Sequence, residues 1–142
     1  MSFDFCCKWL FCALVFQGLF GLALAVLGPE LGLLGFYPYF TDSLWGLPAE
    51  PELVQRFSSW LFGVLGATTL AWGALMACIV AVPFRRREPW AWWALVLSLT
   101  LWYPLDTTLS LTSGVWPNAI LNTLALLMIL PPLLATRKAF VS

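Results

Sequence analysis

Four long apolar stretches dominate the pattern of hydrophobic and polar positions along this chain. They cover approximately residues 9–27, 57–82, 90–111 and 117–134. Each is close to the roughly 20 residues that a helix needs to cross the hydrocarbon core of a bilayer. Lipid offers the backbone no hydrogen-bonding partner, so such segments are expected to be helical. The pattern predicts an all-α, polytopic membrane protein with four transmembrane helices in an antiparallel bundle, built as one domain over residues 1–142.

Glycine and proline mark the ends of these stretches. Pro29 follows the first, and Pro83 is expected to end the second, because proline interrupts the hydrogen-bond ladder of a helix. Gly114 predicts a tight turn between the third and the fourth. Pro131 and Pro132 interrupt the fourth after about 14 residues, or ~21 Å of helix. That helix either ends irregularly or is completed beyond the prolines.

Residues 28–56, between the first two stretches, form a long segment that is both polar and aromatic. It is too rich in glycine and proline for a span and too aromatic for a free linker. We therefore expect a structured extracytoplasmic loop that lies back on the helices as an interfacial cap. Whether such a cap only seals the helices or covers a pocket stays open.

A cleavable signal peptide is the alternative interpretation of the first stretch. Ala23-Leu24-Ala25 has the small-x-small form of a cleavage site. However, Asp4 offsets Lys8 in the region where a signal peptide needs net positive charge. This favours a helix that is retained.

Composition supports the membrane interpretation. The chain is 61% hydrophobic and 10% charged, and it contains no histidine. Its mean hydropathy is +0.88. A soluble domain of this composition would leave large apolar patches in water, so the lipid bilayer is the expected surrounding partner. The formal net charge of zero argues against nucleic acid and against a polybasic role at the lipid surface.

Lysine and arginine are unequally distributed over the predicted topology. Six of them fall on one side, and only Arg56 falls on the other. The positive-inside rule then predicts that both termini are cytoplasmic, in the inner (cytoplasmic) membrane of the cell. Tryptophans at the span ends fit these boundaries, because their amphipathic rings prefer the headgroup level. The six basic residues are Lys8, Arg85, Arg86, Arg87, Arg137 and Lys138, and the tryptophans are Trp9, Trp60, Trp90, Trp92, Trp93 and Trp116.

Small and polar residues recur every four positions in the first two stretches. Such slim stripes let helix backbones approach closely in a membrane. Packing within the chain is the leading interpretation of these faces, and contact with another protein is the alternative. The stripes are Ala13, Gln17, Gly21 and Ala25 in the first stretch and Ser59, Gly63, Ala67 and Ala71 in the second, with Gly66, Gly73 and Ala77 forming another thin face.

The third and fourth stretches carry the polar chemistry. Asp106 is the one carboxylate within the four stretches, and it lies ~24 Å from the inner edge, nearer the outer surface. We expect it to bond Asn122 across the hairpin, with Asn118 nearer the turn. Pro104 leaves the carbonyl of Thr100 without its usual donor and predicts a kink.

Asp106 therefore has two interpretations, as a helix clamp or as part of a site for a ligand or a proton. The ligand would be a lipid-like or amphipathic molecule. The residues that would form such a site are Asp106, Asn122, Asn118, Trp102, Ser110 and Thr100.

Catalytic and cofactor signatures are weak. The cysteines Cys6, Cys7, Cys12 and Cys78 form no C-x-x-C pair, so neither a metal site nor another cofactor is expected. They are interpreted as small buried hydrophobes. Without histidine or a paired nucleophile and base, an enzyme is the least favoured class.

One resemblance follows from the C-terminal half. Together with the polar and turn residues around it, the Asp106 motif resembles small uncharacterised bacterial four-span membrane proteins, a resemblance that implies no known activity. The span count is also similar to the EXPERA sterol-isomerase and sigma-2 receptor group, but their histidine and paired acids are missing here. Small multidrug transporters carry a glutamate in the first helix, where this chain has Gln17. The motif consists of Asp106-Thr107-Thr108, Ser110, Gly114, Asn118, Asn122 and Pro131.

The sequence thus favours a non-enzymatic integral membrane protein, a small accessory or interaction subunit that packs against other membrane helices or against copies of itself. The alternative is a pocket protein or small transporter that binds a lipid-like ligand near Asp106.

Overall fold

The computed structural model of the chain describes residues 1–28, Gly46 and residues 52–140. In this part all regular secondary structure is helical, as predicted, and four helices are long and apolar enough to cross a membrane. The predicted cap between the first two helices falls mostly outside the described residues. The elements are α1 (Phe3–Leu27), α3 (Glu52–Ile79), the π-helix η2 (Val80–Phe84), α4 (Pro89–Thr112), α5 (Trp116–Ala135) and the 3₁₀ turn η3 (Arg137–Ala139).

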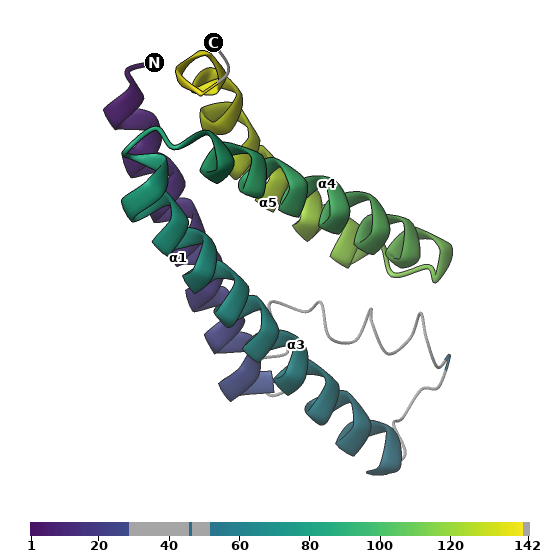
Figure 1. The fold of residues 1–142 in the computed structure, drawn as a ribbon. Coiled ribbons are helices and arrows are strands. Elements are labelled where there is room, and N and C mark those ends of the chain that lie inside the picture. Colours follow the sequence, from purple (N-terminus) through teal and green to yellow (C-terminus); the bar gives the residue numbers. More distant parts are fainter. Residues whose placement is uncertain (29–45, 47–51, 141–142) are drawn as a thin grey trace.

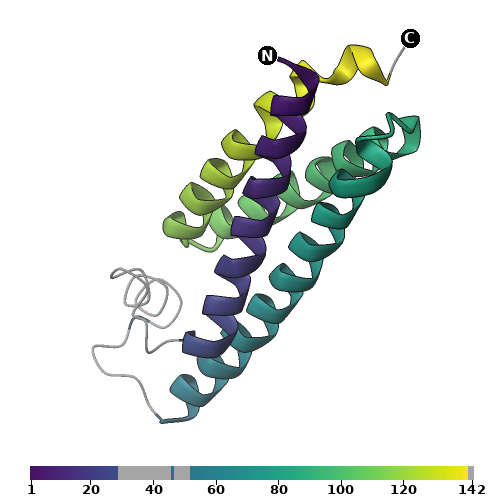
Figure 2. The same ribbon diagram turned by 90° about the vertical axis from the view of Figure 1, so that its left-hand side faces the viewer.

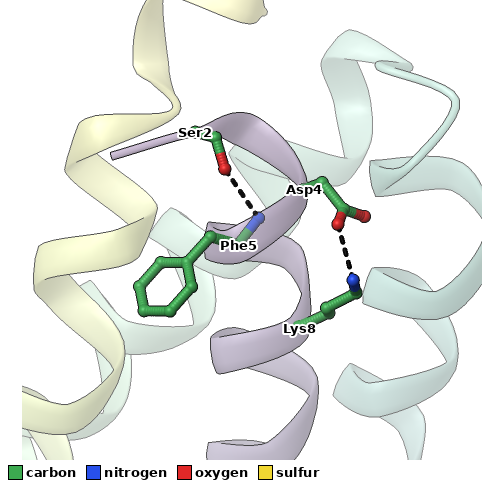
Figure 3. A network of polar contacts seen from close by, with 4 residues as sticks. All are labelled: Ser2, Asp4, Phe5 and Lys8. Carbon is green, nitrogen blue, oxygen red and sulfur yellow. Dashed lines mark hydrogen bonds and ion pairs between the residues drawn. The ribbon is translucent and has the colours of Figure 1, made fainter.

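α1 begins at Phe3 and not near residue 9, because the polar residues before the apolar stretch are good helix starters. The hydroxyl of Ser2 accepts a hydrogen bond from the backbone N–H of Phe5 at 3.3 Å and caps the helix. One turn further on, Asp4 pairs with Lys8 at 2.7 Å (Figure 3). Both interactions favour helix in the segment that hydropathy alone had left out.

The second membrane-length helix is longer than predicted at both ends. α3 starts at Glu52, where an ion pair with Arg56 at 3.3 Å supports its first turn, so the end of the predicted loop is helical. Pro83 does not end the helix, because η2 continues through it as a π-helix. The carbonyl of Pro83 accepts from the N–H of Glu88, five residues on, at 3.0 Å. Proline has no backbone N–H to donate, and the wider π turn lets the helix continue through it.

α5 continues through Pro131 and Pro132 to Ala135, so this helix is completed beyond the prolines. The carbonyl of Leu133, near the end of α5, accepts from the indole N–H of Trp92 at 3.0 Å. Trp92 is only 4% exposed and belongs to the core. Its indole N–H finds a partner inside the protein, and its depth at the membrane interface stays a prediction.

The helices form two pairs, α1 with α3 and α4 with α5 (Figure 1). The pairs meet at the end of the molecule that carries the N-terminus and η3, and they diverge toward the α4–α5 turn (Figures 1 and 2). At the meeting end, all four helices, η2 and the residue after η3 contribute side chains to one apolar core. Its largest fully buried members are Leu10, Leu14, Met76, Val80, Phe84, Leu95, Ile129 and Leu133.

Glycines bring the backbones of α1 and α3 into direct contact. A Cβ on Gly21 would lie 2.6 Å from the backbone nitrogen of Leu70, and one on Gly73 would lie 2.8 Å from that of Gly18. Gly66 meets the backbone of Ala25 even more closely. These contacts run in opposite order along the two helices, so the pair is antiparallel.

The remaining residues predicted to pack helices together lie outside this backbone contact between α1 and α3. Among the described residues, none has an atom within 4 Å of the place where a Cβ on Gly63 would be, and Ala67 is exposed, so this stripe of α3 faces away from α1. Gln17 is buried toward the core, where its side-chain oxygen has no hydrogen-bond partner among the described residues.

Candidate functional site

A polar cluster joins α4 to α5 near their connecting turn. Trp102, Asp106 and Ser110 share one face of α4 at four-residue spacing, and Asn118 belongs to the first turn of α5. We call these four residues the Asp106 cluster. The connection is short because Gly114 adopts a left-handed φ of 74° and the N–H of Val115 bonds back to the carbonyl of Ser110 at 2.8 Å.

Both carboxylate oxygens of Asp106 accept hydrogen bonds. The indole N–H of Trp102 donates to Oδ2 at 3.0 Å. The amide of Asn118 donates to Oδ1 at 2.7 Å, and the hydroxyl of Ser110 lies 3.2 Å from the same atom. Asn118 also donates to the Ser110 hydroxyl at 2.7 Å, so the four side chains form a closed network. Ser110 is only 8% exposed.

The expected bond between Asp106 and Asn122 is not present. The amide of Asn122 instead donates to the hydroxyl of Thr107 at 3.4 Å, and Asn122 is 6% exposed. The tight turn brings the first turn of α5 beside Asp106, so Asn118 is the residue within reach. Asn122 lies one turn further along α5 and meets the next residue of α4.

Thr100 does not join the Asp106 cluster. Its side chain is exposed, and its hydroxyl bonds to carbonyls of its own helix, those of Val96 and Leu97, at 3.0 Å each. A threonine hydroxyl in an apolar helix commonly finds such a partner one turn back.

Trp72 of α3 extends the cluster toward the first helix pair, a role that the sequence analysis missed. Its ring centroid lies 5.3 Å from that of Trp102, and its indole N–H donates to the hydroxyl of Ser98 at 2.7 Å. Trp72 and Trp102 both lie far from the span ends. A tryptophan in the middle of a span is expected to find a hydrogen-bond acceptor for its indole N–H inside the protein. The mid-span position of Trp72 could therefore have indicated this contact.

An open groove of about 360 Å³ lies beside the cluster on the surface of the α4–α5 pair. The hydroxyls of Tyr103 and Thr123 approach within 3.3 Å of each other in its wall. None of the six residues proposed from the sequence for a ligand site lines it. The lining residues are Tyr103, Thr107, Leu111, Trp116, Ala119, Ile120, Thr123 and Leu124.

The cysteines divide into two groups. Cys6 and Cys7 are buried, as expected for small hydrophobes, but Cys12 and Cys78 are exposed on the helix surface. Within residues 1–28 and 52–140, histidine, cysteine and acidic side chains form no group of three that could hold a metal ion.

The geometry of the Asp106 cluster suits a helix clamp. The Trp102 indole and the Asn118 amide both donate to its carboxylate, and the Asn118 bond holds α5 against α4. The Ser110 hydroxyl lies 2.7 Å from the backbone carbonyl of Asp106 and 3.2 Å from Oδ1.

Comparison with protein-family models, with curated proteins and with solved structures gives no match for this chain. The described part of the chain is all-helical, and by length and composition its four long apolar helices are compatible with a multi-pass membrane protein.

Proposed function

We propose that the protein is a non-enzymatic, four-span integral membrane protein that serves as a small accessory subunit, packing against the transmembrane helices of a partner. The proposed location is the inner (cytoplasmic) membrane of a bacterium, with both termini in the cytoplasm. The six-to-one distribution of lysine and arginine supports this orientation.

One observation carries the proposal, the outward face of α3. The small residues Gly63, Ala67, Ala71 and Ala74 lie on this face; the three alanines are exposed, and no atom of the described residues lies within 4 Å of a Cβ on Gly63. At 1.5 Å per residue the stripe is ~16 Å long. Lipid tails do not drive helices together, so close backbone packing is a principal source of helix association in a membrane. The same helix already uses its other small face in this way against α1.

The Asp106 cluster supports the non-enzymatic part of the proposal. Its carboxylate accepts hydrogen bonds from Trp102 and Asn118, the arrangement of a contact between helices. The chain contains no histidine that could act as a general base near neutral pH.

Native mass spectrometry of the gently solubilised particle tests the proposal. The wild-type protein is expected to carry a second polypeptide, and Ala67→Leu should release most of it by filling the stripe. Thr108→Leu is the matched control, since Thr108 is exposed on α4. A monomeric wild-type particle, or equal release by both variants, would contradict the proposal.

Cysteine labelling tests the orientation separately. In a cysteine-free background, a probe at Ser43 should react from outside intact cells and a probe at Arg86 should not. The reverse pattern would place both termini outside.

A second candidate function rests on the groove of about 360 Å³ beside the Asp106 cluster. A groove lined by aromatic rings and hydroxyls could hold one chain of a lipid-like ligand in a pocket protein or small transporter. Ala119→Leu would then displace a small molecule that co-purifies with the wild-type protein, whereas Ala67→Leu would leave it bound. Retention by Ala119→Leu would exclude this candidate.

A further inference from the structure

One end of the molecule collects most of its positive charge. The fold brings the segment Arg85–Arg87, which connects η2 to α4, to the same end as η3, which contains Arg137 and Lys138 (Figure 1). Aromatic side chains pack between the Arg85–Arg87 segment and the residues around η3. The ring of Phe84 lies 4.6 Å from that of Phe140 and 6.1 Å from that of Phe3, measured between centroids.

Few acidic groups balance these cations. Of the described carboxylates at this end, Asp4 is paired with Lys8 at 2.7 Å (Figure 3). Glu88 accepts a hydrogen bond from the indole of Trp90 at 2.7 Å. The five remaining basic side chains, Arg85, Arg86, Arg87, Arg137 and Lys138, are exposed and form no ion pair within the described residues.

The turn that presents the first three arginines is well defined. Arg87 has a left-handed φ of 58°, and its N–H bonds to the carbonyl of Phe84 at 2.9 Å. Its guanidinium lies 4.8 Å from the centre of the Phe3 ring, a cation–π contact. Arg85 and Arg86 precede it and are exposed.

Exposed indoles lie beside this charge. Trp90 and Trp93, at the start of α4, are 54% and 55% exposed. Indole rings in this setting prefer the headgroup level of a bilayer. Cations and exposed indoles thus lie together at one end of four membrane-length helices, the combination that suits the headgroup level of a bilayer.

We propose that the five unpaired basic side chains at this end form a binding surface for the phosphate headgroups of anionic phospholipids. The proposal rests on the membrane location proposed above and is independent of the partner subunit. The net charge of zero had argued against a polybasic role at the lipid surface, and the proposal revises that expectation. The net charge of the whole chain conceals a strong separation of positive and negative charge along the molecule.

The test counts retained lipids by native mass spectrometry, after reconstitution of the full chain into nanodiscs of phosphatidylcholine with phosphatidylglycerol. Wild type should retain phosphatidylglycerol preferentially, and Arg85→Gln with Arg86→Gln should weaken that preference about fivefold per cation removed. Arg56→Gln is the control, since Arg56 is paired with Glu52 on α3. It should retain the wild-type preference.

Salt provides a readout that needs no variant. The preference of the wild type should fall between ~0.05 and ~0.5 M salt, because ions screen exposed charges. Equal retention of charged and neutral lipid by the wild type at low salt would overturn the proposal. The proposal would also be overturned if the preference for phosphatidylglycerol survived removal of all five basic side chains. Binding of an acidic protein segment at this surface would not rescue it. If the membrane location itself were wrong, the Ser43 and Arg86 labelling experiment would reveal it separately.

Discussion

The two helix pairs of this protein are held together in different ways. α1 and α3 touch through their backbones at Gly21, Gly66 and Gly73, whereas near their turn α4 and α5 are joined by side-chain hydrogen bonds around Asp106. In a membrane, apolar side chains gain little by leaving lipid for protein. Close van der Waals contact and hydrogen bonding are the two remaining ways to fix a helix pair. The first pair should therefore be sensitive to side-chain size and the second to the loss of donors or acceptors.

Adding one methyl group to the glycine contact should produce the largest effect. Gly66→Ala places a Cβ against the backbone of Ala25, and backbone cannot move aside as a side chain can. We expect a loss of about 3 kcal/mol in the free energy of unfolding, measured in detergent by thermal or denaturant unfolding. Gly63→Ala, on the same helix but with open space around it, should change stability by less than ~1 kcal/mol. Similar losses in both variants would remove the distinction between the two faces of α3.

A double-mutant cycle should detect the coupling across the second pair. Asp106→Ala and Asn118→Ala should each lower stability, and together they should lose less than their sum by about 0.6 kcal/mol and at most ~1.7 kcal/mol. The same cycle with Asn122→Ala in place of Asn118→Ala should be nearly additive, because Asn122 bonds Thr107. If Asp106 were coupled more strongly to Asn122 than to Asn118, the Asp106–Asn122 pairing expected from the sequence would be correct.

A smaller loss than at Gly66 is expected where the two pairs meet. Trp72→Phe keeps an aromatic ring beside Trp102 but removes the donor to Ser98. We expect a loss of about 1 kcal/mol that is not increased by adding Ser98→Ala. Trp60→Phe, at an exposed tryptophan, provides the reference for the loss of an indole. A loss in Trp72→Phe no larger than this reference would mean that the bond contributes nothing.

The helices themselves were predictable, because apolar stretches of membrane length have few alternatives to helix. Their ends were less so. Hydropathy ignores capping by Ser2 and the Asp4–Lys8 pair, and it treats Pro83 as a stop although a π turn can pass through it.

The residues of the Asp106 cluster on α4 were predictable, but the residue of α5 that pairs with them was not. Four-residue spacing placed Trp102, Asp106 and Ser110 on one face, as the structure shows. The choice between Asn118 and Asn122 depends on how tightly the chain turns at Gly114, and helix counting does not contain that information. The contact of Trp72 with Trp102 depends on how the two pairs approach each other, a property of tertiary packing alone.

The substitution Asp106→Asn tests the clamp most directly, because it keeps the shape of the side chain and changes only its hydrogen bonding. An amide replaces one acceptor oxygen by an NH₂ group. This group faces either the Trp102 indole, which can only donate, or the Asn118 amide, which must turn its oxygen inward and give up its donation to Ser110. The account predicts a loss of about 1–3 kcal/mol in stability, with the composition of the surviving native particle unchanged. Unchanged stability together with loss of a bound ligand or its pH dependence would contradict it and make Asp106 a functional site.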